Sequence, residues 1–573
     1  MLKKKIWPGI GLLAMLLVLG LLLAATRPGA LTTAQQAPIL DWRFGVIESY
    51  ESPAAADQLG AAWTRITFHW GEMQPNSAED WIPPVTTAQL QNERESGREV
   101  TGLLIGLPGW ARDSQGLPAG LYLPPDDPGN LWAAYVRRII GYYAADVQHW
   151  VIWNEPDIWD KETPGHTWDG SEEDFAQLLR VAYLVAKTEN PAAIIHLPAF
   201  TYFWDANYGR EQYMRRLLAV LVADPEAAAH NYYFDVATAH LYFQPDQIYN
   251  VLVEFQAIMQ EFGLQKPIWL METNAPPIDD PAWPVESPTL LVTQEEQAAF
   301  MPQVIAVALA AGAERIGIFK LIDTETDRVA NPEPFGLLRM DGSSRPGFDT
   351  YQLASAYLSG VEQATRERWD AIGQIRLDQR DTTTTVIFAR LPEPQLVQVP
   401  ATAQTAVLAS MWGEQRQVSA QEGVFEVIVP PARCAQYIGT YCMIGGETFY
   451  LIQAKAGKTL PPDLPVRQLS PLPTPIPTLP VANTPVREKP EIEQTTSPTV
   501  VFPLLEETVT ATNTAQPSPT PTAQPDADLD PVGQTVAPNR PADALPLGYM
   551  AIGAAAVLAL LLGVVAWRMM RSP

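Results

Sequence analysis

Two glutamates, each at the end of an apolar run, are the residues of this sequence best placed to do chemistry. Glu155 lies in the segment HWVIWNEPD, and Glu272 lies in KPIWLMETN. A carboxylate that follows a core-like run must be solvated, paired or functional, because burying it without a partner costs free energy. Taken singly, Glu155 could be a surface residue of an ordinary turn, and Glu272 could be a structural ion-pair partner.

Two such carboxyl groups acting together are what the hydrolysis of a glycosidic bond requires. One protonates the glycosidic oxygen, and the other attacks the anomeric carbon or activates water to do so. A separation of about 5–5.5 Å gives retention of configuration through a covalent intermediate, and a wider gap gives inversion. The sequence also carries 17 tryptophans, and aromatic rings stack on the apolar C–H faces of sugars.

Alternating strand-like and helical segments between residues 43 and 358 must position these glutamates. The predicted strands are 43–50, 64–70, 100–107, 150–153, 194–197, 234–242, 267–272 and 315–321, and the predicted helices between them include 130–144, 172–187, 211–222, 247–262 and 294–311. Ser171 followed by Asp174 predicts an N-cap, and Gly312 suits a helix end.

This alternation predicts a parallel α/β fold. The count and the length favour a closed (β/α)₈ TIM barrel, although periodicity alone leaves an open doubly wound sheet possible. Active sites of such barrels lie at the carboxyl ends of the strands, and Glu155 and Glu272 both stand at predicted strand ends.

The segments around these glutamates resemble the clan A retaining glycoside hydrolases, and within them family 39 or a related bacterial group. These are (β/α)₈ enzymes with the acid/base after strand 4 and the nucleophile at the end of strand 7. The resemblance covers roughly residues 41–358. It implies that Glu155, in the N-E-P motif, is the general acid/base, that Asn154 binds the sugar 2-hydroxyl, and that Glu272 is the nucleophile.

Further segments extend the resemblance. Arg65 in WTRITFHW is similar to the strand 2 arginine that supports the nucleophile, and GLPGWA, with Trp110, is similar to the strand 3 segment. His240 and Tyr242 in AHLYF stand where the clan places residues that contact the nucleophile or the substrate. Each of these, like Trp153, could instead be an ordinary core residue.

The segment of the predicted eighth strand departs from the clan. Many members carry a tryptophan at its end as a sugar platform, whereas this chain has IGIFKLIDT, with Phe319, Lys320 and Asp323. Lys320 could bind an acidic sugar, or it could form a structural ion pair with Asp323. The sugar, the linkage and the choice between exo and endo action therefore stay open.

Composition excludes several other functions. The formal net charge of −26 argues against a nucleic-acid partner. No G-x-G-x-x-G or P-loop follows a predicted strand, and the six histidines lack metal-ligand spacing, so no cofactor is expected. The leading hypothesis is a retaining, membrane-tethered β-glycosidase that acts on oligosaccharides, polysaccharides or glycosides. The alternatives are a catalytically inactive carbohydrate-binding protein on the same barrel and a purely structural surface head, and the oligomeric state is undetermined.

The chain outside the barrel divides by composition. We expect a signal peptide or signal anchor at 1–36, the catalytic domain at 37–358, an antiparallel β-sandwich domain at 359–457, a Pro/Thr-rich stalk at 458–545, a transmembrane helix at 546–567 and a cytoplasmic tail at 568–573. The catalytic head would then face outside the cytoplasm. There a disulfide between Cys434 and Cys442 is plausible, with two free thiols as the alternative.

Overall fold

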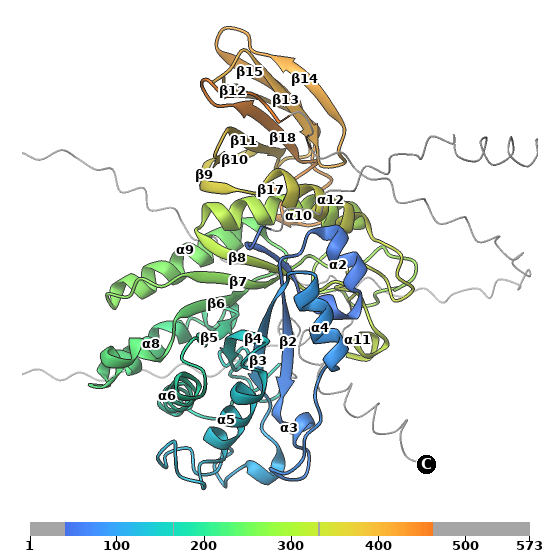
Figure 1. Cartoon of the computed structure of the whole chain (residues 1–573). Coiled ribbons are helices and arrows are strands. Elements are labelled where there is room, and N and C mark those ends of the chain that lie inside the picture. The colour runs from blue at the N-terminus through green and yellow to red at the C-terminus, as the bar shows by residue number, and fades with distance from the viewer. Residues whose placement is uncertain (1–40, 164, 331–332, 462–463, 465–573) are drawn as a thin grey trace, which may run out of the picture. The chain divides into compact units, whose positions relative to one another are not determined.

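The computed structural model describes residues 41–163, 165–330, 333–461 and 464 (Figure 1). The predicted signal segment 1–36, nearly all of the stalk, the predicted transmembrane helix 546–567 and the tail 568–573 lie outside the described residues. Within the described ranges, no helix is long and apolar enough to cross a membrane.

Eight parallel strands close into a barrel, in the order in which they occur in the sequence. They are β1 (Phe44–Val46), β2 (Trp63–His69), β3 (Glu99–Ile105), β4 (Val147–Ile152), β5 (Ile194–Phe200), β6 (Val236–His240), β7 (Ile268–Thr273) and β8 (Ala313–Ile318). Every predicted strand overlaps one of these. The predicted closed barrel is therefore confirmed, and the open doubly wound sheet is excluded.

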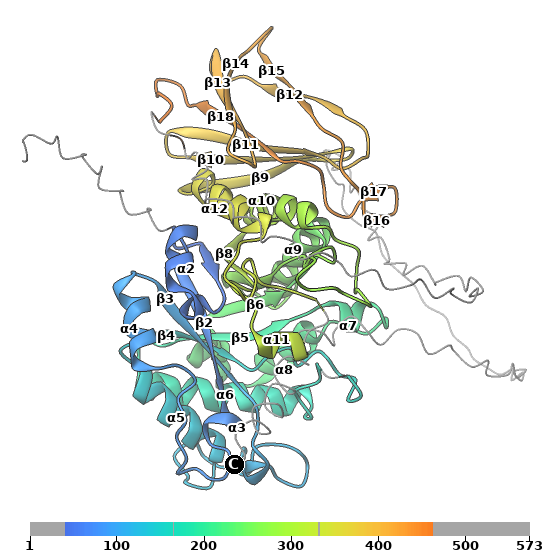
Figure 2. The same cartoon turned by 90° about the vertical axis from the view of Figure 1, so that its right-hand side faces the viewer.

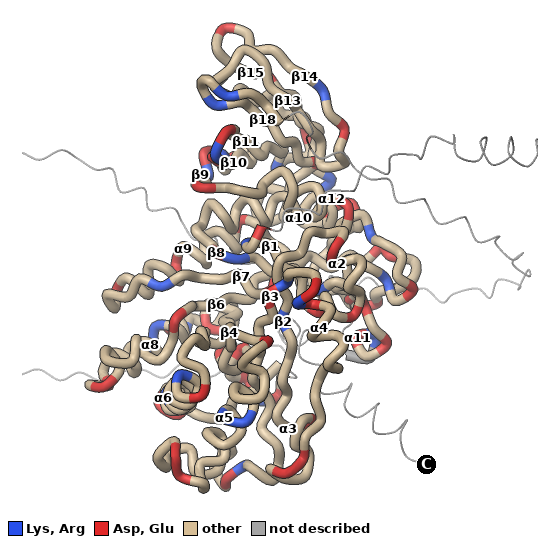
Figure 3. The backbone as a smooth tube through the Cα atoms, viewed as in Figure 1, with Lys and Arg blue, Asp and Glu red and all other residues tan. Residues whose placement is uncertain are grey.

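Helices cover the outside of the barrel (Figure 1). The longer ones are α2 (Pro53–Leu59), α4 (Thr87–Glu95), α5 (Leu131–Tyr143), α6 (Glu172–Glu189), α8 (Tyr213–Ala223), α9 (Pro245–Glu261), α10 (Gln294–Ala310) and α12 (Pro346–Tyr357). Ser171 and Asp174 form the capping box of α6, and Gly312 follows α10 with φ 83°, a left-handed conformation that glycine adopts without a steric penalty. Acidic and basic residues are interspersed over these helices (Figure 3).

Two tryptophans fill the amino-terminal half of the barrel interior. The rings of Trp63 and Trp269 lie 5.4 Å apart, centroid to centroid. Gly45 on β1 leaves room for Trp63, because a Cβ there would lie 2.3 Å from the indole ring. The large rings on β2 and β7 therefore require a glycine on the neighbouring strand β1. Their packing fills the amino-terminal end of the barrel.

The domain after the barrel is built of antiparallel strands. A six-stranded sheet has the order β14-β13-β18-β11-β10-β9, and β12 pairs with β15. The strands of these sheets are β9 (Val361–Trp369), β10 (Ile372–Gln379), β11 (Thr382–Ala389), β12 (Gln395–Pro400), β13 (Thr405–Ser410), β14 (Gln415–Ser419), β15 (Val424–Val429) and β18 (Phe449–Ala454). Val397 and Phe425 of the pair share a buried cluster with Leu408 and Leu451 of the sheet. The predicted antiparallel domain is confirmed.

Helix α10 packs between the barrel and this domain, and it lies beside β9 in both views (Figure 1 and Figure 2). Its Gln303 accepts a hydrogen bond from the Gly445 N–H at 3.0 Å and donates one to the Gly446 carbonyl at 3.1 Å. On the barrel side α10 is also covered, which explains why it is apolar around most of its circumference.

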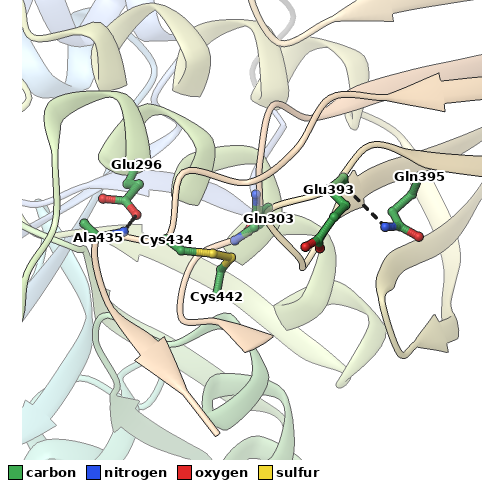
Figure 4. Close-up of a disulfide and its surroundings, with 8 residues drawn as sticks. Glu296, Gln303, Glu393, Gln395, Cys434, Ala435 and Cys442 are labelled. Carbon is green, nitrogen blue, oxygen red and sulfur yellow. Dashed lines mark hydrogen bonds between the residues drawn. A yellow bond between two sulfur atoms is a disulfide. The ribbon is translucent and has the colours of Figure 1, made fainter. Parts of the chain in front are cut away.

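Cys434 and Cys442 form a disulfide, with their Cα atoms 4.7 Å apart (Figure 4). Cys434 precedes the short strand β16 (Tyr437–Ile438), and Cys442 is the last residue of β17 (Tyr441–Cys442). Beside Cys434, the Ala435 N–H donates to Glu296 on α10 at 2.8 Å. Of the two alternatives that the sequence left open, the structure therefore has the disulfide, and it lies against the barrel.

Candidate active site

The acid/base candidate Glu155 lies in a sharply turned loop directly after β4. Trp153 and Glu155 both have positive φ angles, 72° and 47°, which non-glycine residues rarely adopt and which cost on the order of 1–3 kcal/mol each. Two backbone hydrogen bonds hold the loop in place. The Trp153 N–H donates to the Leu104 carbonyl at 2.8 Å, and the Glu155 N–H donates to the Ala199 carbonyl at 3.1 Å. Neighbouring strands β3 and β5 thus fix the direction of the Glu155 side chain.

Glu155 and Glu272 converge at the carboxyl ends of the strands. One carboxylate oxygen of each, together with a ring nitrogen of His240, lie within 4.8 Å of one another. Nδ1 of His240 is 2.7 Å from Glu155 Oε1, and its Nε2 is 3.5 Å from Glu272 Oε1. All three side chains are buried. The last residue of β6 therefore bridges the carboxylates that follow β4 and end β7.

Two donors stabilise the ionised form of Glu272. Nη2 of Arg65, on β2, lies 2.5 Å from Glu272 Oε1, and the Tyr242 hydroxyl donates to Oε2. Burial alone would raise the pKa of Glu272. The charges of Arg65 and His240 and the hydrogen bond from Tyr242 together outweigh the effect of burial, so the pKa of Glu272 is lowered. Burial and the Glu272 charge raise the pKa of Tyr242 well above its ordinary value, so its hydroxyl stays a donor.

Asn154 directly precedes Glu155 in the chain, and its side-chain amide forms no hydrogen bond within the described ranges. Its backbone carbonyl accepts a hydrogen bond from Thr167 Oγ1 at 2.6 Å. A nearly buried amide without a protein partner is suited to bind a substrate hydroxyl.

Glu155, His240 and Glu272 each direct one atom that could bind a metal toward the same point. The three ligand atoms are spread over 4.8 Å, and the Arg65 guanidinium already occupies one oxygen of Glu272 at 2.5 Å. A cation there would meet the positive charge of Arg65 at close range. The donor set therefore fits a hydrogen-bonded carboxylate pair better than a metal centre.

The two predicted tryptophans have different surroundings. Trp110 is only partly buried, and its indole N–H donates to the Gln74 carbonyl at 2.7 Å. Trp153 is 2% exposed and packs between Trp132 and Trp168, at centroid distances of 6.3 and 5.4 Å. Trp110 keeps a surface that a ligand can reach, whereas Trp153 is part of the core and offers no ring face to a sugar.

Lys320 is not a free cation at the site. It is 3% exposed, and its ammonium group lies 2.9 Å from Asp327 and contacts Glu48. The predicted ion pair with Asp323 is wrong, because Asp323 instead pairs with Arg345 at 2.6 Å. Since the charge of Lys320 is balanced twice within the protein, the structure gives no support to its binding an acidic sugar.

Two residues near the site were not predicted. Asp157 accepts hydrogen bonds from the Thr201 N–H, the Thr201 hydroxyl and the Tyr202 N–H at 2.8–3.0 Å. Burial, opposed by these bonds and assisted by the charge of Glu155, raises its pKa to about 7. His69 ends β2, and burial lowers its pKa to about 4. Both stood in segments quoted above, two residues after Glu155 and at the end of a predicted strand, and these positions were their only signals.

Comparison with known proteins agrees on the fold. No protein-family model and no curated protein matches the chain. A solved family 39 glycoside hydrolase from the gut symbiont Bacteroides cellulosilyticus WH2 is similar over 72% of this chain and 81% of its own, with a TM-score of 0.53 and 14% identity. A glucosidase from Croceicoccus marinus matches with a TM-score of 0.49 and 12% identity, covering 73% of this chain and 97% of its own.

At this level of identity the likeness concerns the fold. The protein is a closed (β/α)₈ barrel followed by an antiparallel β domain, and its fold is similar to that of a family 39 glycoside hydrolase. The resemblance to clan A glycoside hydrolases that the sequence predicted is confirmed at the level of the fold.

Proposed function

We propose that this protein hydrolyses O-glycosidic bonds in oligosaccharides, polysaccharides or glycosides by a retaining double displacement. The observation that carries the proposal is the convergence of Glu155 and Glu272, whose carboxylate oxygens lie within 4.8 Å of each other at the carboxyl ends of β4 and β7. Retaining enzymes hold their two carboxyl groups about 5–5.5 Å apart, whereas inverting enzymes need roughly 6.5–9.5 Å. The resemblance to clan A further suggests a β-linked substrate.

In the first step, Glu272 attacks the anomeric carbon while Glu155 gives its proton to the glycosidic oxygen, so that the leaving group departs as an alcohol. The lowered pKa of Glu272 keeps the nucleophile ionised. Arg65 and Tyr242 hold its two oxygens, and the free amide of Asn154 binds the sugar 2-hydroxyl. In the second step, Glu155 takes a proton from water, which attacks the anomeric carbon and releases Glu272.

The decisive experiment uses Glu272→Ala and a panel of activated aryl glycosides. We expect wild type to hydrolyse at least one of them and the variant to be inactive. Added azide should restore turnover of the variant and give a glycosyl azide of inverted configuration, because the small anion occupies the place of the missing carboxylate. If wild type cleaves no glycoside but binds glycans, the protein is instead a carbohydrate-binding protein on a glycosidase-like barrel.

We also propose that this head is held outside the cytoplasm on a membrane. Residues 547–567 form an uncharged apolar run followed by Arg568 and Arg571, which is typical of a membrane anchor with a cytoplasmic basic flank. The disulfide between Cys434 and Cys442 is favoured in an oxidising compartment. Whole cells treated with protease should lose the head, and a head protected from protease until lysis would contradict the proposal.

A further inference from the structure

Three aromatic side chains gather on the loops that follow β4 and β5. The rings of Trp159 and Trp204 lie 5.9 Å apart at 86°, and the Tyr208 ring meets Trp159 at 5.0 Å and 83°. Tyr208 lies parallel to Trp204, with 8° between the planes and 6.2 Å between the centroids. The Trp159 indole N–H donates to the Trp204 carbonyl at 3.3 Å. The two loops thus share one aromatic cluster.

This cluster is fixed to the turn that carries Glu155. The turn is closed by the Ile158 N–H, which donates to the Glu155 carbonyl at 3.1 Å. Trp159 comes four residues after Glu155, so their Cα atoms are at most about 14 Å apart. Asp157 binds the backbone of Thr201, at the start of the second loop. Both loops therefore lie beside the acid/base.

One member of the cluster faces solvent. Tyr208 is 50% exposed, whereas Trp204 beneath it is 8% exposed. The Arg210 guanidinium lies 4.7 Å from the Trp159 ring centroid and 3.5 Å from Asp205. Because Trp204, Trp159 and Arg210 hold the loop, Tyr208 is an exposed ring on a rigid support, and such a ring suits the apolar face of a sugar.

The side of the site on which the ring lies follows from the chemistry. A general acid must reach the oxygen of the leaving group, so the loop that carries Glu155 borders the part of the substrate that departs. We propose that Tyr208, supported by Trp159 and Trp204, binds a sugar on the leaving-group side of the scissile bond. The substrate is then an oligosaccharide or polysaccharide rather than a glycoside of a small alcohol. This inference rests on the proposed function.

The test compares two substrates that differ in their leaving group. A glycosyl fluoride has a single atom on the leaving-group side and cannot contact Tyr208, whereas a β-linked tetrasaccharide of the same sugar can. The sugar is whichever of glucose, xylose, galactose, mannose or glucuronic acid gives the fluoride that wild type hydrolyses fastest. For Tyr208→Ala we expect kcat/KM on the tetrasaccharide to fall about 2–13-fold, the range of an aromatic contact, with kcat/KM on the fluoride unchanged.

Two further variants serve as controls. Tyr208→Phe keeps the ring and should retain the activity on the tetrasaccharide. Tyr142→Ala removes a 62% exposed tyrosine on α5, away from the β4 and β5 loops, and should affect neither substrate. The inference is overturned if wild type cleaves the fluoride but no tetrasaccharide, or if Tyr208→Ala changes both substrates alike or neither. Failure of wild type to cleave any fluoride would instead refute the proposed function.

Discussion

The two ends of the barrel interior both hold arginine, histidine and glutamate, but they combine them differently. At the amino-terminal end, Glu99 lies 3.0 Å from Arg315 and 2.8 Å from His149, and His149 Nδ1 lies 2.8 Å from Nε2 of His196. Trp269 closes this cluster, with its ring 4.3 Å from the Arg315 guanidinium. Arg315 pairs with Glu99 here, and the Glu314 carboxylate accepts a hydrogen bond from the Trp269 indole N–H at 2.7 Å.

At the carboxyl-terminal end two carboxylates converge on one histidine, His240. Arg65 binds Glu272, Glu155 Oε1 lies 2.7 Å from Nδ1 of His240, and the Asn154 side-chain amide forms no hydrogen bond among the described residues. The comparison teaches that buried charge and histidine do not by themselves mark a site of chemistry. The convergence of Glu155 and Glu272 on His240 distinguishes the end that we propose is catalytic.

The largest expected difference between the two ends is in activity. Glu272→Gln should lower kcat/KM on an aryl glycoside by roughly 10⁴-fold or more, because a nucleophile has no substitute in the site. Glu99→Gln should leave kcat/KM within about twofold and lower stability by about 1 kcal/mol, since its ion pair is partly exposed. Steady-state kinetics and thermal unfolding of both variants test this. Equal losses of activity would abolish the distinction between the two ends.

Replacing the arginine at each end of the barrel should affect the pH dependence of kcat/KM differently. Arg65→Met removes the charge that lowers the pKa of Glu272, so the acid limb of kcat/KM should move to higher pH, with an activity loss of about 10²–10³-fold. Arg315→Met should leave the profile in place, because its partner Glu99 takes no part in the proposed chemistry. An unmoved acid limb in Arg65→Met would show that this limb does not report the ionisation of Glu272.

Because of Asp157, which lies near the candidate site, the free energy of unfolding of the protein should fall as pH rises. Its pKa is raised to about 7 in the folded protein, against about 3.9 in an unfolded chain. Its contribution is therefore complete below about pH 4 and is lost as pH rises to 7, at up to about 1.4 kcal/mol per pH unit. Unfolding of Asp157→Asn by denaturant should lack this dependence. Parallel curves for wild type and variant between pH 4 and 7 would contradict it.

His196, at the amino-terminal end of the barrel, should make the free energy of unfolding fall as pH is lowered. Its effect should be smallest near neutral pH. Burial, and the charges of His149 and Arg315, lower its pKa well below the ordinary value. Its contribution is present above about pH 6.5 and is lost as pH falls, at up to about 1.4 kcal/mol per pH unit. His196→Gln should weaken the acid sensitivity of unfolding between pH 6.5 and 5 while activity at pH 7 stays unchanged. An unaltered acid sensitivity would exclude His196 as its source.

Much of the fold could be predicted because its signals are local. Apolar runs marked all eight strands, and the serine and acid of one capping box marked the start of α6. The site was predictable where side chains stand at strand ends, as Glu155 and Glu272 do, since closing a parallel barrel brings those ends together. The contact of Lys320 with Glu48 was not predictable, because Glu48 belongs to a segment far away in the sequence.

The sequence by itself determined the alternation of strands and helices, the position of two carboxylates at strand ends and the antiparallel character of the second domain, because side-chain periodicity is set by neighbours along the chain. Only the tertiary structure decided that Trp153 is core, that Asp157 is buried with a raised pKa, and that one oxygen of Glu155 and one of Glu272 lie within 4.8 Å of each other. Those properties depend on distances and burial between segments far apart in the chain, which no local pattern records.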